Sequence, residues 1–252
     1  MIVAVDIGNS RIKMGLFSGN ELLEVLVFPH VGFESALTSL PKWNEIRNEA
    51  RMLGICSVGR EALASKVKHL FAWLPDSHRV DIGHTSKFPI RNNYRTPQSL
   101  GMDRLCVAVA AQAESPGFPI LILDAGSAVT SEFVDHQGTY QGGTISPGLT
   151  MRFRALQAFT AKLPWVEAEG EHPLVGKDTP TAIRSGVVNG FVAELQALID
   201  EHKMTHGSNL VVYLTGGDLP FLRNRLKNIN FADAHLLLRG IHILTLHNAQ
   251  TP

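Results

Sequence analysis

The feature that most constrains the fold is a pattern of three strands that occurs twice. In each copy a short apolar strand leads into Asp-x-Gly, and a polar turn, a second strand, a glycine turn and a third strand follow. Asp6 and Asp124 are 118 residues apart, and the second-turn glycines, Gly19 and Gly138, are 119 apart. This agreement indicates an internal duplication, with chance similarity of short strands as the competing explanation. The predicted strands are residues 2–5, 12–17 and 22–28 in one copy and 120–124, 129–134 and 140–145 in the other.

Helical and strand patterns alternate through the rest of the chain, which favours an α/β protein. No linker-like segment separates the halves, so we expect two packed lobes, 1–115 and 116–252. Ser99 is the expected N-cap of one helix, and Pro147-Gly148 is expected to open another. Apolar spacing predicts helices over about 33–50, 61–73, 100–114 and 179–204, buried strands over 51–58 and 210–214, and a loop with short strands over 75–97.

Composition excludes several classes of protein. The 252 residues are 44% hydrophobic, which is too apolar for a disordered chain. Lys and Arg number 23 and Asp and Glu 23, so the chain lacks the basic excess that a broad nucleic-acid-binding face requires. Cys56 and Cys106 lie in apolar runs and cannot build a disulfide scaffold or a cysteine zinc site. Neither a signal peptide nor a membrane span is expected, so we predict a cytoplasmic protein that binds small molecules.

The residues after the first strand of each copy are suited to phosphate. In Asp6-Ile7-Gly8-Asn9-Ser10 the glycine lets backbone approach a ligand, and Lys13 adds a point charge further along the hairpin. Taken alone, this segment is better explained as an ordinary Asx turn between strands. Asp124-Ala125-Gly126-Ser127 repeats it, and two such turns facing each other could hold a triphosphate with its cation. Thr215-Gly216-Gly217 offers a further platform for a nucleotide, and neither a P-loop nor a Rossmann fingerprint is present.

Taken in order, six motifs resemble those of type III pantothenate kinases. They are DxGNS at residue 6, GxDR at Gly101–Arg104, DxGSA at residue 124, GTYQGGTISPGL at residue 138, GKDT at Gly176–Thr179, and LTGGD ending at Asp218. That family shares a superfamily with acetate kinase, hexokinase, Hsp70 and actin. The resemblance therefore implies two duplicated ribonuclease H-like lobes of the actin-like ATPase class, with mixed sheets flanked by helices. It also implies ATP-dependent phosphorylation of pantothenate, an alcohol acceptor, to 4'-phosphopantothenate in the first step of coenzyme A biosynthesis.

By the same resemblance, each motif residue has an expected role. Asp103 is the proton acceptor, and Asp124 binds a monovalent cation, K⁺ or NH₄⁺, while Mg²⁺ accompanies ATP. The resemblance also implies a homodimer with no nucleic-acid or membrane partner. The expected ATP-binding residues are Asp6, Ile7, Gly8, Asn9, Ser10, Arg11, Ile12, Lys13 and Ser127, and the expected pantothenate-binding residues are Tyr94, Gly101, Met102, Asp103, Arg104 and Thr179.

The chemistry of these residues fits phosphoryl transfer. Asp103 lies in the first turn of a predicted helix, where the dipole favours the ionised form that accepts a hydroxyl proton. Arg104 could pair with a carboxylate or a phosphate. Without the neighbouring motifs, the simpler interpretation is a carboxylate at a helix N-terminus beside a solvated arginine. The chain departs from the family pattern where Ser10 and Ser127 replace Thr, and where the longer Glu132 replaces Asp.

Two other functions compete with this one. Another kinase of the superfamily, acting on acetate or a sugar, would keep the phosphate turns but need a different pocket. A catalytically silent nucleotide-binding accessory factor in transcription is the alternative from a different class; retention of Asp6, Lys13, Asp103 and Asp124 disfavours it. His202 and His206 are spaced like metal ligands on a helix, but with no third ligand we interpret them as a solvated last turn.

Overall fold

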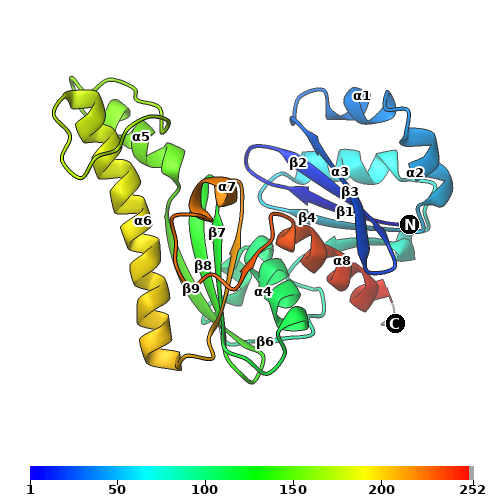
Figure 1. The fold of residues 1–252 in the computed structure, drawn as a ribbon. Helices are drawn as coiled ribbons and strands as arrows, with labels where there is room; N and C mark the ends of the chain where they lie inside the picture. The colour runs from blue at the N-terminus through cyan, green and yellow to red at the C-terminus, as the bar shows by residue number, and fades with distance from the viewer. Residues whose placement is uncertain (250–252) are drawn as a thin grey trace. The chain divides into compact units, whose positions relative to one another are not determined.

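The structure is a computed structural model that describes residues 1–249 of the chain. The polypeptide forms two compact units. The first contains Met1–Glu114 together with the C-terminal segment that starts at His235, and the second contains Ser115–Ala234. Each unit is organised around its own β-sheet, coloured blue to cyan in the first unit and mostly green in the second (Figure 1).

The sheet of the first unit has the order β3-β2-β1-β4-β5. Its first three strands form an antiparallel meander, and β4 and β5 add in parallel on the other side of β1. The bounds are Ile2–Ile7 for β1, Ile12–Ser18 for β2, Glu21–Phe28 for β3, Met52–Ser57 for β4 and Arg79–Ile82 for β5.

The second unit repeats this plan. Five strands of its sheet lie in the order β9-β8-β7-β10-β11, again an antiparallel meander followed by two parallel strands. Gly19 and Gly138, in corresponding turns, both have positive φ, at 54° and 74°. The duplication predicted from the sequence is therefore confirmed. The bounds are Ile120–Ala125 for β7, Ala128–Val134 for β8, Thr139–Pro147 for β9, Val211–Thr215 for β10 and Phe231–Ala232 for β11.

Helices cover both faces of the first sheet. Alternate residues of β1 point to opposite sides, so Val3, Val5 and Ile7 join the apolar core under one set of helices. Ala4 and Asp6 face the other set, where Gly54 of β4 lies against Thr245. The first set is α1 (Phe33–Thr38), α2 (Trp43–Glu49) and α3 (Glu61–Leu70), and the second is α4 (Met102–Glu114) and α8 (Leu236–Ala249).

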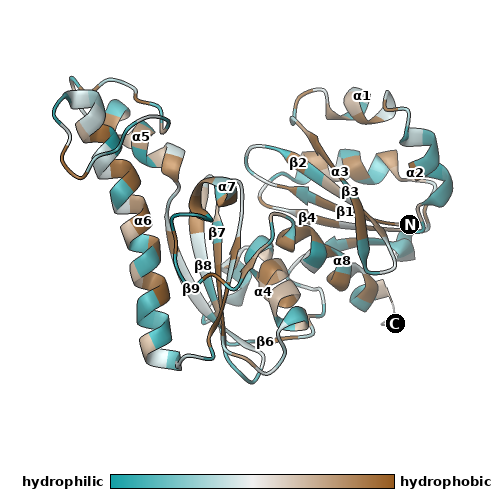
Figure 2. Ribbon diagram, in the orientation of Figure 1, coloured by the Kyte–Doolittle hydropathy of each residue, from teal (hydrophilic) through white to brown (hydrophobic). Residues whose placement is uncertain are grey.

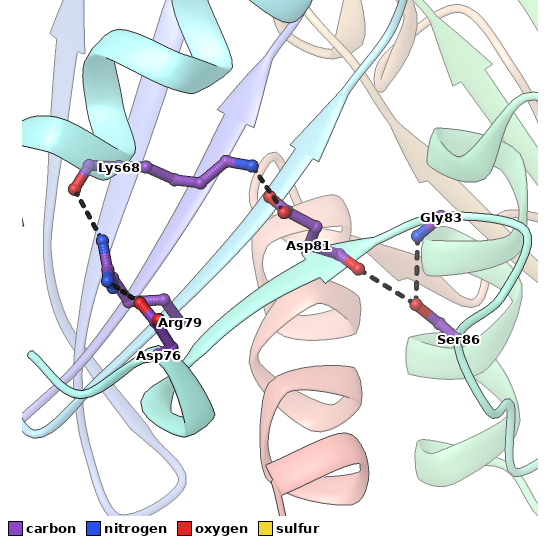
Figure 3. A network of polar contacts seen from close by, with 6 residues as sticks. All are labelled: Lys68, Asp76, Arg79, Asp81, Gly83 and Ser86. Carbon is purple, nitrogen blue, oxygen red and sulfur yellow. Dashed lines mark hydrogen bonds and ion pairs between the residues drawn. The ribbon is translucent and has the colours of Figure 1, made fainter.

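Short elements flank β5 in the chain, and two ion pairs involve its residues. Residues 75–99 hold two 3₁₀ helices, Asp76–His78 and Pro97–Ser99, and the short strand β6 (Arg91–Asn92), much as expected for a loop with short strands. Figure 3 shows the network along β5, in which Lys68 Nζ lies 2.6 Å from Asp81 Oδ2 and Arg79 pairs with Asp76. Ser86 Oγ donates to the Asp81 carbonyl and accepts from the Gly83 N–H, which closes the turn after β5.

The core of the second unit lies between one face of its sheet and three helices. Leu121, Leu123 and Leu214 point from the strands into this core, and Phe191 and Leu195 meet them from α6. In Figure 2 α6 mixes hydrophobic and hydrophilic positions, as a helix with one buried stripe should. The three helices are α5 (Leu149–Ala158), α6 (Thr179–His206) and α7 (Leu219–Leu222).

Four sequence-based expectations differ from the structure. The helix expected over 33–50 is two helices, α1 and α2, because Pro41 interrupts it. Ser99 is not the N-cap of α4: it ends a 3₁₀ helix and its hydroxyl donates to Thr96. His202 and His206 are not solvated, since both rings pack on Phe133. The sequence pattern places 116–252 in one lobe, whereas α8 packs within the first unit.

Within residues 1–249, none of the helices has the length and apolarity to cross a bilayer.

Candidate active site

The first phosphate turn starts from a buried carboxylate. Asp6, only 6% exposed, lies opposite Lys13 in the β1–β2 pair and opposite Cys56 in the β1–β4 pair. Gly8 N–H donates to the Arg11 carbonyl at 3.1 Å, which closes the turn between the buried Ile7 and Ile12. Asn9, Ser10 and Arg11 are exposed to solvent.

Two residues outside the motif hold this turn. His30 Nε2 lies 3.0 Å from the Gly8 carbonyl oxygen, and Arg60 NH2 donates to the Asn9 carbonyl at 3.0 Å. The contacts of His30 and Arg60 with this turn cannot be predicted from the sequence. Both side chains bind main-chain oxygens, and no side-chain pattern near residues 30 or 60 signals such contacts.

Two cysteine thiols are buried in the first unit. Cys56 of β4 and Cys106 of α4 are both fully buried. The pKa of the Cys56 thiol is raised well above its ordinary value by its hydrogen bond to Cys106, by burial, and by the negative charges of Asp6 and Asp103. Both carboxylates thus act electrostatically on the Cys56 thiol.

The GMDR segment is tightly folded at the start of α4. Asp103 Oδ1 accepts the Arg104 N–H at 2.9 Å, and a Cβ on Gly101 would lie 2.4 Å from that same oxygen. Arg104 is not a solvated helix charge, because it is only 6% exposed and its guanidinium lies 5.8 Å from the centre of the Tyr94 ring. Met102 is buried, so Asp103, Arg104 and Tyr94 supply the polar groups here.

The second unit assembles three turns in close backbone contact. Asp124 lies opposite Thr130 and Thr215, and Gly126 N–H donates to the Ala128 carbonyl beside the exposed Ser127. Gly216 has φ of 96°, and a Cβ there would lie 2.2 Å from the Ala125 carbonyl oxygen. A Cβ on Gly148 would lie 2.1 Å from the Gly126 oxygen and 2.6 Å from the Ser127 oxygen. Only glycine permits these approaches, so the three turns pack backbone against backbone.

Thr179 lies at the start of α6. It is exposed and follows Asp178, whose carboxylate accepts the Thr181 N–H at 2.8 Å in a reciprocal capping box. The pKa of Asp178 is lowered by the backbone and hydroxyl hydrogen bonds from Thr181. The site residues are thus divided between the units: Asp6–Lys13, Tyr94 and Gly101–Arg104 in the first, and Asp124, Ser127 and Thr179 in the second.

Glu132 points to the same face of its sheet as Asp124. It is completely buried on β8, and the Tyr140 hydroxyl donates to its Oε2 at 2.5 Å. Within residues 1–249, no cluster of three or more His, Cys, Asp or Glu side chains is arranged to hold a metal ion. A cation at Asp124 would therefore need hydroxyl, carbonyl or water oxygens besides the carboxylate. Thr130 and Thr215, its register neighbours, offer such hydroxyls.

Comparison with known proteins decides the family. A family model described as type III pantothenate kinase matches residues 2–201. The chain belongs to the type III pantothenate kinase family. A type III pantothenate kinase of Phocaeicola vulgatus is 41% identical over 98% of this chain and 99% of that protein. One from Flavobacterium johnsoniae is 37% identical over 96% of each chain.

Solved structures extend the likeness of this pantothenate kinase to the wider fold. A Baf family transcriptional activator from Campylobacter jejuni has a TM-score of 0.63 at 20% identity, covering 99% of this chain and all of that one. Component A of (R)-2-hydroxyglutaryl-CoA dehydratase from Acidaminococcus fermentans has a TM-score of 0.54 at 12% identity, over 98% and 96% of the two chains. At such identities the likeness shows the fold alone, and it agrees with the two duplicated lobes of the actin-like ATPase class.

Proposed function

We propose that the chain phosphorylates the primary hydroxyl of pantothenate with Asp103 as the proton acceptor. As a type III pantothenate kinase it is an ATP-dependent, Mg²⁺-using enzyme whose product, 4'-phosphopantothenate, begins coenzyme A biosynthesis. The observation that carries the role of Asp103 is its place in the first turn of α4, directly before Arg104, whose guanidinium lies by the Tyr94 ring. A carboxylate next to the cation proposed to bind pantothenate stands where the attacking hydroxyl can be oriented.

The geometry of each segment supports the other proposed roles, which are ATP binding, pantothenate binding and neutralisation of the phosphate charge. Residues Asp6–Lys13 and Ser127 would bind ATP through exposed turn atoms, and Tyr94, Gly101–Arg104 and Thr179 would bind pantothenate. Arg104 presents a cation beside the Tyr94 ring, which suits the pantothenate carboxylate. Mg²⁺ bound with ATP supplies charge neutralisation on the phosphates.

Asp124 is the proposed site of a monovalent cation. Its carboxylate is half-buried at the end of β7, with Thr130 and Thr215 as register neighbours. Potassium and ammonium both accept oxygen ligands of this kind. Glu132, which points to the same face, is engaged by Tyr140, so it stands as a neighbour of the cation site and not as a proposed ligand.

We further propose that the enzyme is a homodimer that works in the cytoplasm, where ATP is available. Large apolar side chains stand exposed directly after α5 and in the segment before α6: Phe159 and Leu174 are each 89% exposed and Val175 is 71% exposed. Exposed apolar side chains of this kind suit an interaction surface. The segment before α6 ends beside Thr179, so a second subunit there would border the proposed pantothenate site. Sedimentation velocity should show a dimer that Phe159→Asp with Leu174→Asp converts to a monomer; a monomeric wild type would refute this part.

The alternatives have weaker support. A kinase of acetate or sugars shares the fold, but the relatives that match nearly the whole chain are pantothenate kinases. The likeness to the Campylobacter jejuni activator is one of fold, at 20% identity. A silent accessory factor would also have no need to keep Asp103.

ADP release is the decisive experiment. Purified protein is given ATP, Mg²⁺ and K⁺, with pantothenate added or withheld, and the product is identified by mass. We expect ADP release that depends on pantothenate, together with phosphopantothenate. ATP binding without pantothenate-dependent release would favour the silent factor or another acceptor, and acetate and sugars would be the compounds to compare.

A further inference from the structure

Two side chains from distant segments bind the main chain of the first phosphate turn. His30 Nε2 lies 3.0 Å from the Gly8 carbonyl oxygen, and Arg60 NH2 donates to the Asn9 carbonyl oxygen at 3.0 Å. A carbonyl oxygen only accepts hydrogen bonds, so the His30 ring carries a proton on Nε2 and donates it. Two neighbouring carbonyl groups of the turn are therefore each held by a donor from outside the turn.

The end of β3 brings His30 to the turn. Phe28, the last residue of β3, lies opposite Ile12, the first residue of β2. The buried Phe28 ring also packs edge-on against Phe33 of α1, with ring centres 5.3 Å apart. These contacts fix the chain on both sides of His30, which is itself half-buried. The packing of its neighbours therefore places the imidazole beside the turn that precedes β2.

The end of β4 brings Arg60 to the same turn. Ser57, the last residue of β4, lies opposite Ile7, and the Val58 N–H donates to the Ile7 carbonyl oxygen at 3.3 Å. Gly59 follows with φ of 65°, a backbone conformation that glycine adopts without strain, and the chain then enters α3. Arg60 is exposed after this bend. Its long side chain therefore reaches the main chain of the turn from the neighbouring strand end.

The planarity of the peptide group makes these contacts a constraint on the N–H groups of the turn. In a trans peptide group the carbonyl and the N–H of the next residue point in opposite directions. A donor on the Gly8 oxygen therefore directs the Asn9 N–H away from His30. In the same way, a donor on the Asn9 oxygen directs the Ser10 N–H away from Arg60. The Gly8 N–H already closes the turn by donating within it, so the amides that a phosphate can meet begin at Asn9.

We propose that His30 and Arg60 are positioning residues for ATP. They orient the Asn9 and Ser10 N–H groups toward the phosphate groups of the nucleotide. This inference rests on the proposed ATP site. Successive backbone N–H groups that point the same way attract an anion, whereas carbonyl oxygens turned toward it would repel it. The two side-chain donors hold the carbonyls on the other side, and a turn already in its binding conformation has less ordering to lose when ATP binds.

Substitutions at both positions test these contacts. His30→Ala removes one donor, whereas His30→Gln keeps one, because the glutamine amide can occupy the place of Nε2. Arg60→Ala removes the other donor together with its charge. The matched controls are Arg51→Ala and His69→Ala. Arg51 is exposed directly before β4 and donates to the Asn48 carbonyl oxygen at 2.7 Å, and His69 is exposed on α3.

The readout is the dissociation constant of Mg·ATP, measured by calorimetry without pantothenate, with folding checked by thermal melting. We expect His30→Ala and Arg60→Ala each to weaken ATP binding about three- to tenfold, the effect of losing one hydrogen bond. His30→Gln and both controls should bind like the wild type. In turnover assays KM for ATP should rise while KM for pantothenate stays unchanged, a split that a role in fold stability alone would not produce.

Salt separates positioning from attraction between charges. Added choline chloride screens the attraction of an exposed arginine for ATP but does not reorient the amides of the turn. The ratio of wild-type to Arg60→Ala affinity should therefore persist at high salt. A ratio that falls to one would show that Arg60 acts by its charge and would overturn its role as a positioning residue.

Several other results would overturn the inference. Wild-type ATP affinity in His30→Ala or in Arg60→Ala would do so, as would an equal loss in His30→Gln and His30→Ala. If one of the alanine variants does not fold, the other decides the matter. A wild type that binds ATP but fails to phosphorylate pantothenate would overturn the proposed reaction alone, whereas a wild type that binds no ATP would overturn this inference as well.

Discussion

Among single residues, Asp103 is the one whose replacement best separates catalysis from binding. Asparagine keeps the oxygen that accepts the Arg104 N–H, so the start of α4 should be preserved. It cannot accept a proton from the pantothenate hydroxyl. We expect Asp103→Asn to lower kcat by about 10²-fold or more, the range of general-base catalysis, with little change in ATP affinity. Steady-state kinetics and ATP titration measure the two effects.

The same helix provides a control for this prediction. Glu114 is the exposed last residue of α4, so Glu114→Gln makes the same chemical change far from the GMDR segment. It should leave kcat unchanged. Turnover near the wild-type rate in Asp103→Asn would remove Asp103 from the role of proton acceptor.

Asp124 carries a different prediction, because its charge is proposed to face a cation. Asp124→Ala should weaken ATP binding and abolish the response of the rate to added potassium or ammonium. The assay compares KCl with choline chloride at equal ionic strength, in the wild type and in Asp124→Ala. Asp135→Ala, which leaves the end of β7 untouched, should keep the wild-type response. A potassium response that survives in Asp124→Ala would place the cation elsewhere.

Some contacts of single residues can be predicted from the sequence, and others cannot. The Asp-x-Gly turns are visible because Asp and Gly have strong local preferences. His30 and Arg60 are not, since each binds a main-chain oxygen of a turn far away in sequence.

Between elements, the contact of α4 with α8 depends on one glycine. A Cβ on Gly240 of α8 would lie 1.9 Å from the Cys106 carbonyl oxygen, one turn after Asp103 in α4. Backbone cannot move aside as a flexible side chain can. We expect Gly240→Ala to destabilise the first unit by about 1–3 kcal/mol or more, as overpacking does, and to lower kcat by displacing Asp103. Urea unfolding and steady-state kinetics measure both.

A second helical glycine gives the opposite expectation. Gly190 of α6 has open space where a Cβ would be placed. Gly190→Ala should therefore stabilise the second unit by about 0.5–1 kcal/mol, the difference in helix propensity. If Gly240→Ala also raised the free energy of unfolding, helix propensity and not the contact with Cys106 would govern position 240.

Elements are predictable where a local pattern determines them. Strands β1, β2, β7 and β8 follow from apolar runs around polar turns, and the duplication follows from the matched spacing of the Asp-x-Gly turns and of the glycine turns after them. The assignment of α8 to the first unit depends on tertiary packing. Gly54 and Gly240 admit α8 closely against β4 and α4, and no pattern within residues 236–249 names those partners.

For the molecule as a whole, two histidines link stability to pH, one in each unit. Burial lowers the pKa of His242 below its ordinary 6.5, and the charge of Arg239 adds to this. Burial also lowers the pKa of His202, with a further contribution from His206. The unfolded chain therefore binds more protons than the folded one just below pH 6.5. Stability is complete above that pH and is lost as the pH falls through the folded pKa values.

We expect the thermal midpoint of the protein to be lower at pH 5.5 than at pH 7.5, and His242→Phe to reduce the difference in the first unit. His242 stacks on Phe17 with ring centres 4.3 Å apart, and neither ring nitrogen has a hydrogen-bond partner within the described residues. Phenylalanine keeps the stack and removes two buried, unsatisfied polar atoms, so it should also raise the midpoint at both pH values. Circular dichroism melts at constant ionic strength measure this, with the exposed His84→Asn as control. An unchanged pH dependence in His242→Phe would show that the protons bind elsewhere, because the variant has lost the most deeply buried imidazole of the unit.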